Sequence, residues 1–154
     1  MATRKAGKGT WVVTGIKGLD KALKALPAKI EKKVLRQAMR KGVKPIQAAA
    51  KANVPVRSGT LKKAIKVRAM KRKKDRLGVL VIVGQGDFKG ETFYGAMIEY
   101  GHFAGKRGTP DRKFVEAKPF MRPAFETNKE AVGKETVRLI REGVENEVKG
   151  LKVK

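Results

Sequence analysis

The chain has 154 residues, 41% of them hydrophobic, and no cysteine. This composition allows a folded core, and the absence of cysteine excludes disulfides, thiolate catalysis and zinc sites built on sulfur. The formal net charge is +24, and residues 1–77 hold most of it, with 24 Lys and Arg against 3 Asp and Glu, so indifference to polyanions is excluded.

The first residues predict a tail in front of one domain. Residues 1–10 are basic and rich in glycine, and we expect a flexible arm without the apolar segment of a signal peptide. A short β-type run follows at Trp11–Thr14. No apolar run approaches the ~20 residues of a membrane span, so we expect no membrane partner. The sequence suggests a single domain over residues 11–148 and a short tail at 149–154.

A long helical pattern follows. From Leu19 to Met39 apolar residues recur at steps of three and four, which is typical of an amphipathic helix. We expect Pro27 to divide a short helix from a longer one, Pro45 to kink the longer one, and this helix to end near Asn53. Its polar face is almost entirely basic. Such a face can be simply solvated or can bind a partner, but an ordinary exposed helix carries more acidic residues.

Two β-type segments come next, Ala64–Met70 with alternating basic residues and the continuously apolar Val79–Val83. The second pattern is typical of a strand buried on both faces. The basic stretch between them predicts a hairpin with a long charged tip. We expect this region to contact either DNA or an acidic neighbour. The candidate contact residues are Lys62, Lys63, Lys66, Arg68, Lys71, Arg72, Lys73, Lys74 and Arg76.

The remaining segments complete an α+β pattern. The glycines of residues 84–90 do not have the spacing of a nucleotide-binding loop, so we expect a turn and loop there. Phe93–Tyr100 predicts a short helix with one apolar side, and Gly101–Lys118 a long loop. From Pro119 onward an apolar stripe predicts a second long helix. The chain should therefore form an α+β fold in which a small antiparallel or mixed sheet packs with two long helices.

Residues with catalytic potential are scarce. His102 is the only histidine, and its neighbours Glu99 and Asp111 do not have the spacing of a metal site. Ser58 has no evident base. We therefore expect no enzyme, no metal and no cofactor. Aromatic residues do not lie among the lysines, and no groove-reading motif is evident, so any DNA contact would involve phosphates without sequence readout.

Two motifs, in this order, resemble a phage family. The first is Asn53–Ile65 (NVPVRSGTLKKAI), and the second joins Tyr94–Gly101 (YGAMIEYG) to Lys118–Phe125 (KPFMRPAF). They are similar to the neck, or tail-completion, family of long-tailed bacteriophages, that of the gene 10 product of coliphage Hong Kong 97. The likeness covers about Ile16–Val148, most of the chain. The motif residues that we expect to build the fold or an interface are Pro55, Arg57, Gly59, Leu61, Glu99, Tyr100, Gly101, Pro119, Phe120, Arg122, Pro123 and Phe125.

One segment departs from the family pattern. The family commonly shows a threonine where this chain has His102, and residues 102–117 form an apparent insertion. An interface built there could be lost or enlarged.

The resemblance implies a non-enzymatic subunit of a closed, sixfold homo-oligomeric ring at the head–tail junction of the virion, assembled in the host cytoplasm. Its neighbours would be the tail terminator and head-closure or connector proteins, with genome DNA along the axis. The alternative is a sequence-independent nucleic-acid-binding protein that contacts phosphates, whose affinity for DNA would fall steeply with salt.

Overall fold

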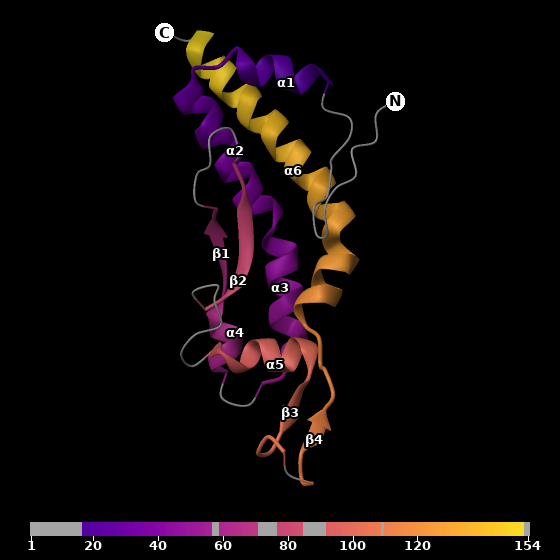
Figure 1. Cartoon of the computed structure of the whole chain (residues 1–154). Helices are drawn as coiled ribbons and strands as arrows, with labels where there is room; N and C mark the ends of the chain where they lie inside the picture. Colours follow the sequence, from indigo (N-terminus) through magenta and orange to yellow (C-terminus); the bar gives the residue numbers. More distant parts are fainter. Residues whose placement is uncertain (1–16, 57–58, 71–76, 85–91, 109, 153–154) are drawn as a thin grey trace.

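The computed structural model describes residues 17–56, 59–70, 77–84, 92–108 and 110–152 (Figure 1). The arm expected at residues 1–10 and the β-type run at Trp11–Thr14 lie outside these residues. The described part is an α+β fold of helices and two antiparallel two-stranded sheets, as predicted. Its elements are α1 (Lys17–Lys24), α2 (Ala28–Gly42), α3 (Lys44–Asn53), α4 (Thr60–Ala64), β1 (Ile65–Ala69), β2 (Val79–Val83), α5 (Tyr94–Tyr100), β3 (His102–Ala104), β4 (Lys113–Val115) and α6 (Met121–Lys152).

Pro27 divides a short helix from a longer one as the sequence predicted, and the longer one is interrupted next to Pro45, where a kink was expected. Pro27 is the N-cap of α2, and Pro45 lies in the first turn of α3. A proline fits a first turn because the amide that it lacks would have no intrahelical acceptor there. Val43 alone separates α2 from α3. Its backbone stays α-helical, with φ −84° and ψ −3°, and it bonds to Met39 and Gln47, so one helix passes almost directly into the next. The expected end at Asn53 is confirmed.

α6 runs along α2 and α3 (Figure 1). The first core cluster joins α1, α2 and the C-terminal half of α6. Small residues set the approach of α2 to α6. A Cβ placed on Gly143 would lie 2.7 Å from Val34 Cγ1, and one on Gly42 would overlap Thr136 Oγ1. The buried residues of the cluster are Leu19, Leu23, Leu26, Val34, Ala38, Ile140 and Val144.

Gly42→Ala is expected to destabilise the chain by about 1–2 kcal/mol, because overpacking against Thr136 outweighs the gain in helix propensity. Thermal unfolding followed by circular dichroism measures this change. Thr136→Ala removes the overlapping hydroxyl, so the double variant should regain part of the lost stability. If Gly42→Ala raised the melting temperature, the close approach would carry no cost.

The second core cluster joins α3, the β1–β2 sheet and the start of α6. Ile65 of β1 and Phe120, just before α6, are its largest fully buried side chains. The other buried members are Ala50, Val54, Leu61, Val83 and Ala124. Phe120 therefore anchors the beginning of α6 beside the sheet.

β1 and β2 pair antiparallel, from Ile65 opposite Val83 to Ala69 opposite Val79, which confirms the predicted hairpin. The expectation that Val79–Val83 is buried on both faces is wrong, since Leu80 is 44% exposed. Lys66, Arg68 and Leu80 are exposed on one face of this two-stranded sheet, so none of the described helices covers that face, which we call the open face. Directly before β1 the chain forms the short helix α4, which the sequence reading did not predict.

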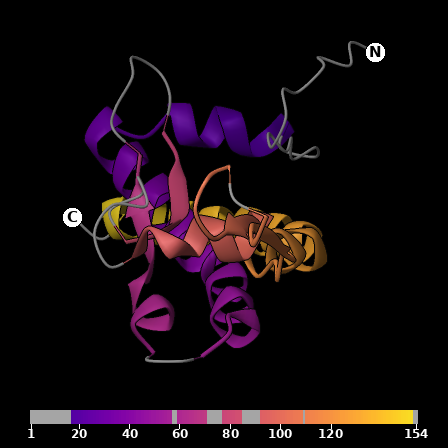
Figure 2. The same ribbon diagram turned by 60° about the horizontal axis from the view of Figure 1, so that its bottom comes forward.

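The prediction of a long loop over Gly101–Lys118 is also wrong, because this segment contains a second hairpin. β3 pairs antiparallel with β4, from His102 opposite Val115 to Ala104 opposite Lys113. Strands of three residues are too short for alternation to reveal them. From here on, the arm means β3 and β4 together, and not the N-terminal residues 1–10. The arm extends from the end of α5 away from the helices (Figure 1) and lies toward the viewer when this end is turned forward (Figure 2).

Candidate interaction surfaces

Glu99, at the end of α5, connects two parts of the chain that are distant in sequence. Only 7% of the residue is exposed. Its Oε2 accepts hydrogen bonds from the backbone N–H groups of Phe120 at 2.8 Å and Met121 at 2.9 Å, and its Oε1 accepts one from Arg122 at 2.9 Å. The two halves of the second sequence motif therefore meet through one side chain.

These three amides are the ones that α6 cannot satisfy itself. The first four N–H positions of a helix have no intrahelical acceptor. Phe120, Met121 and Arg122 supply three of them, and the fourth position is Pro123, which has no N–H. The Glu99 carboxylate thus caps the helix completely, and its charge complements the positive end of the helix dipole.

The base of the arm is fixed on both sides. Lys118 donates its backbone N–H to the carbonyl of Ile98 at 2.7 Å, next to the Glu99 contacts. Gly101 has φ 74° and ψ 166°, a conformation that is essentially restricted to glycine. A Cβ at Gly101 would lie 2.7 Å from Phe114 Cζ and 2.9 Å from the Val115 carbonyl oxygen. The arm therefore leaves the body in one direction that residue 101 sets.

The arm presents aromatic side chains to solvent. The rings of Phe103 and Phe114 meet edge to face at 5.1 Å, and the Arg112 guanidinium lies 4.4 Å from the centre of the Phe103 ring. Phe103 is 57% exposed and Phe114 is 54% exposed. Exposed aromatic and arginine side chains that are held rigidly are typical of protein interaction surfaces.

α5 and the residue before it expose further apolar side chains. The sequence placed Phe93, Met97 and Tyr100 on one side of the helix, and all three are exposed, Tyr100 by 64%. The core-facing side of α5 instead holds Gly95 and Glu99, which are buried. We call Phe93, Met97, Tyr100, Phe103 and Phe114 the aromatic surface. Phe103 and Phe114 were not predicted from the sequence. Each is a single aromatic residue in a segment without apolar periodicity, so no pattern marks it.

The predicted basic contacts fall into two groups. Lys62, Lys63, Lys66 and Arg68 are all exposed, on α4 and β1. The tip residues Lys71, Arg72, Lys73, Lys74 and Arg76 lie outside the described residues. Lys66 pairs across the sheet with Ile82, and Arg68 pairs with Leu80, so cations and aliphatic side chains share the open face.

The other motif residues lie at turns and helix ends. Gly59, with φ 75°, precedes α4, and Leu61 is buried in the second cluster. Phe120 is fully buried and Phe125 half-buried, whereas Pro55, Pro119 and Arg122 are exposed. Arg57 lies outside the described residues.

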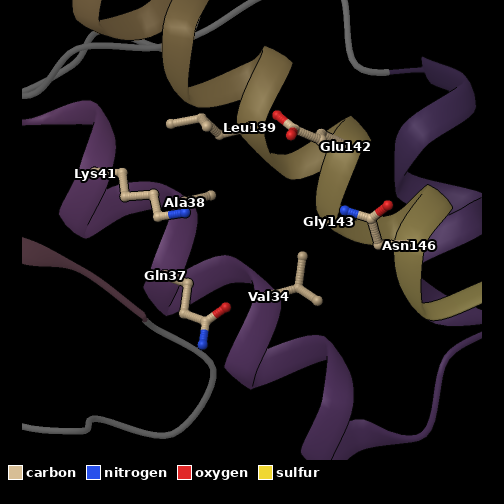
Figure 3. Close-up of a pocket in the computed structure, with 8 residues that line it drawn as sticks. All are labelled: Val34, Gln37, Ala38, Lys41, Leu139, Glu142, Gly143 and Asn146. Carbon is tan, nitrogen blue, oxygen red and sulfur yellow. The ribbon is translucent and has the colours of Figure 1, made fainter. Parts of the chain in front are cut away.

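Three hollows lined by described residues are small. The groove between α2 and α6 in Figure 3 has a volume of about 110 Å³, and two others have about 210 and 290 Å³. Small-molecule sites usually exceed roughly 300 Å³. No group of three or more His, Asp or Glu side chains that could hold a metal ion occurs among the described residues, and none of their helices could span a membrane. The residues lining the Figure 3 groove are Val34, Gln37, Ala38, Lys41, Leu139, Glu142, Gly143 and Asn146.

Shifted pKa values occur on the solvated side of α6, away from these surfaces. A hydrogen bond from Arg138 lowers the pKa of Glu135, and a hydrogen bond to Glu126 raises the pKa of Lys129. The Glu135 contribution to stability is therefore present above its unfolded pKa and is lost as pH falls through the lowered one. Because both groups are exposed, solvent screens these pairs.

The comparison with protein families gave one match. The family described as "Bacteriophage HK97-gp10, putative tail-component" matches residues 17–103, from α1 to the first strand of the arm. Searches of curated proteins and of solved structures gave no match. The match contains the first motif and Glu99-Tyr100-Gly101, while the Glu99 bonding partners at residues 120–122 lie beyond it. The chain belongs to the HK97-gp10-like family of bacteriophage tail components.

Proposed function

We propose that the chain is a structural, non-enzymatic virion protein of a long-tailed bacteriophage, a subunit of a ring that joins tail to head around the DNA channel. Family membership is the observation that carries this proposal. The ring would be homo-oligomeric and sixfold, and its neighbours would be the tail terminator and the head-closure or connector proteins. Assembly would take place in the host cytoplasm.

The surfaces described above support an assembly role. The side chains of the aromatic surface are exposed. Apolar side chains that gather on a protein surface usually mark an interaction site. The arm that carries part of it is held at its base by Glu99 and Lys118. A rigid surface loses little conformational freedom on binding, which favours association.

Deletion of the gene in the phage that encodes this chain tests the proposal. We expect filled heads and complete tails that fail to join, as seen by electron microscopy of infected-cell lysates, with joining restored by the gene supplied in trans. Mass spectrometry of purified virions should detect the chain. Normal joining in the deletion, or virions without the chain, would overturn the proposal.

Phe103→Ser with Phe114→Ser is expected to abolish self-association of the purified chain while the fold persists, because both side chains are more than half exposed. Sedimentation velocity in buffer of high ionic strength measures the assembly state, because salt screens the repulsion between chains of charge +24. Val56→Ser, at an exposed residue outside the aromatic surface, is the matched control. Unchanged assembly of the double variant would remove the arm from the subunit contact.

Sequence-independent nucleic-acid binding is the second candidate, favoured by the exposed cations at Lys62, Lys63, Lys66 and Arg68. It predicts that the logarithm of the DNA affinity falls with the logarithm of salt concentration at a slope of about −0.9 per phosphate contact. A shallow slope would count against it.

A further inference from the structure

One edge of β2 has no strand beside it in the described part of the chain. Gly84 donates its N–H to the Ala64 carbonyl, and Met70 donates to the Gly78 carbonyl, each at 2.9 Å. In an antiparallel ladder the hydrogen-bonded pairs alternate. Ile82 and Leu80 therefore bond to β1, whereas the N–H and C=O groups of Val79, Val81 and Val83 point away from it.

No backbone group of the described residues forms a hydrogen bond with these outward groups. An apolar strand edge of this kind is a ready template for another strand. The edge residues Val81 and Val83 also line the hollow of about 210 Å³ beside Tyr100 and Phe120, so apolar space is available next to the edge.

The open face beside this edge is positively charged and partly aliphatic. Lys66 and Arg68 alternate with Val67 along β1, so they share the face that carries Leu80 and Ile82. Lys62 and Lys63 add two exposed cations on α4, directly before β1. No Asp or Glu occurs among residues 59–70 and 77–84, so Lys62, Lys63 and Lys66 give the described part of this face a positive charge.

We propose that the outer edge of β2 and the adjoining open face bind an extended, acidic segment of another virion protein, which adds to the sheet as a third strand. This inference rests on the proposed role in the virion. The edge amides bind the backbone of that segment, and the cations select for its acidic side chains. Its apolar side chains pack beside Leu80 and Ile82, their direct cross-strand neighbours.

This face suits a protein strand better than DNA. Strand addition uses donors and acceptors in alternation, and the outward row at Val79, Val81 and Val83 offers both. A DNA backbone presents only hydrogen-bond acceptors to a protein. It also has no apolar group that would pack against the side chain of Leu80, which is 44% exposed.

Hydrogen exchange of the full-length chain tests the mode of binding. The probe is a synthetic peptide of alternating Glu and Val, compared with a peptide of the same composition in which the Val residues are grouped and with a short DNA duplex. We expect the alternating peptide to slow exchange at the amides of Val79, Val81 and Val83, with the amides of Leu80 and Ile82 unaffected because the ladder already protects them. Its affinity should exceed that of the grouped peptide by about tenfold.

Two variants separate the edge from the charge. Val81→Pro removes an outward N–H without removing a ladder bond, and Lys66→Glu with Arg68→Glu reverses the charge of the face. Each should weaken binding of the alternating peptide by about tenfold or more. Arg36→Glu with Arg40→Glu, on exposed positions of α2, makes the same charge change elsewhere and should have little effect. Circular dichroism verifies that each variant is folded.

The outcomes are distinct. Equal affinity for both peptides, protection away from the β2 edge, or tighter binding of the duplex would overturn the strand-addition proposal. In the phage, normal head–tail joining with Val81→Pro, together with failed joining in the gene deletion, would reject the docking site and leave the proposed function intact. Normal joining in the deletion would reject the function instead.

Discussion

Replacing Glu99 by alanine is expected to lower the free energy of unfolding by about 3 kcal/mol, because the amides of Phe120, Met121 and Arg122 lose their acceptor at the start of α6. The Phe120 amide is buried, so water replaces the carboxylate poorly. For a chain of this length the melting temperature should fall by roughly 6–12 °C. Urea unfolding followed by circular dichroism measures the free energy directly.

Two comparisons separate capping from general effects. Glu99→Gln retains an amide oxygen as acceptor but loses the charge, so its stability should lie between wild type and Glu99→Ala. Glu126→Ala removes an exposed carboxylate from α6, the helix that Glu99 caps, and should leave the melting temperature nearly unchanged. Equal effects of Glu99→Ala and Glu126→Ala would mean that the cap does not stabilise α6.

Replacing Gly101 by alanine is expected to destabilise the chain by about 3 kcal/mol, through backbone strain and overpacking combined. The backbone of Gly101 has φ 74° and ψ 166°, which a residue with a Cβ adopts only at a cost. The added Cβ would also lie 2.9 Å from the Val115 carbonyl oxygen, and a backbone atom cannot move aside without shifting the arm. Thermal unfolding measures the loss of stability, and the self-association assay should report a weakened assembly.

Gly108→Ala provides a matched control in the same segment of the chain. Gly108 also has a positive φ, 85°, but nothing lies within 4 Å of a Cβ placed there. It should therefore show the strain without the clash, about 1–2 kcal/mol. A second comparison, Gly101→Ala with Phe114→Ala, removes the ring contact and leaves the contact with Val115. If Gly101→Ala and Gly108→Ala were equally destabilising, crowding at the base of the arm would be negligible.

The helices with a repeating apolar pattern and the first hairpin could be predicted from the sequence. Repeats of apolar residues located α1, α2, α3 and α6, because many residues report the same helical face. Pro27 marked a helix start and Pro45 an irregularity in the longer helix, each for a local steric reason. The β1–β2 pairing followed from two apolar segments on either side of a basic stretch.

The features that were missed depend on tertiary structure. The arm consists of two strands of three residues, and Gly101 and the Glu99 bonds hold it in place, so no local periodicity marks it. An apolar run such as Val79–Val83 reads as buried on both faces, but only the number of covering layers decides whether Leu80 is exposed. The motif residue Glu99 was identified, yet its role as a helix cap required knowing which helix begins beside it.

The cap at Glu99 has a consequence for synthesis on the ribosome. Its three donors come from residues 120–122, and both core clusters include residues of α6. A nascent chain that ends within the arm would therefore hold an uncompensated carboxylate and two incomplete cores. Contacts between residues so distant in sequence form late and slowly. Stable folding should thus wait until α6 has left the exit tunnel, which makes α6 the helix that completes both core clusters.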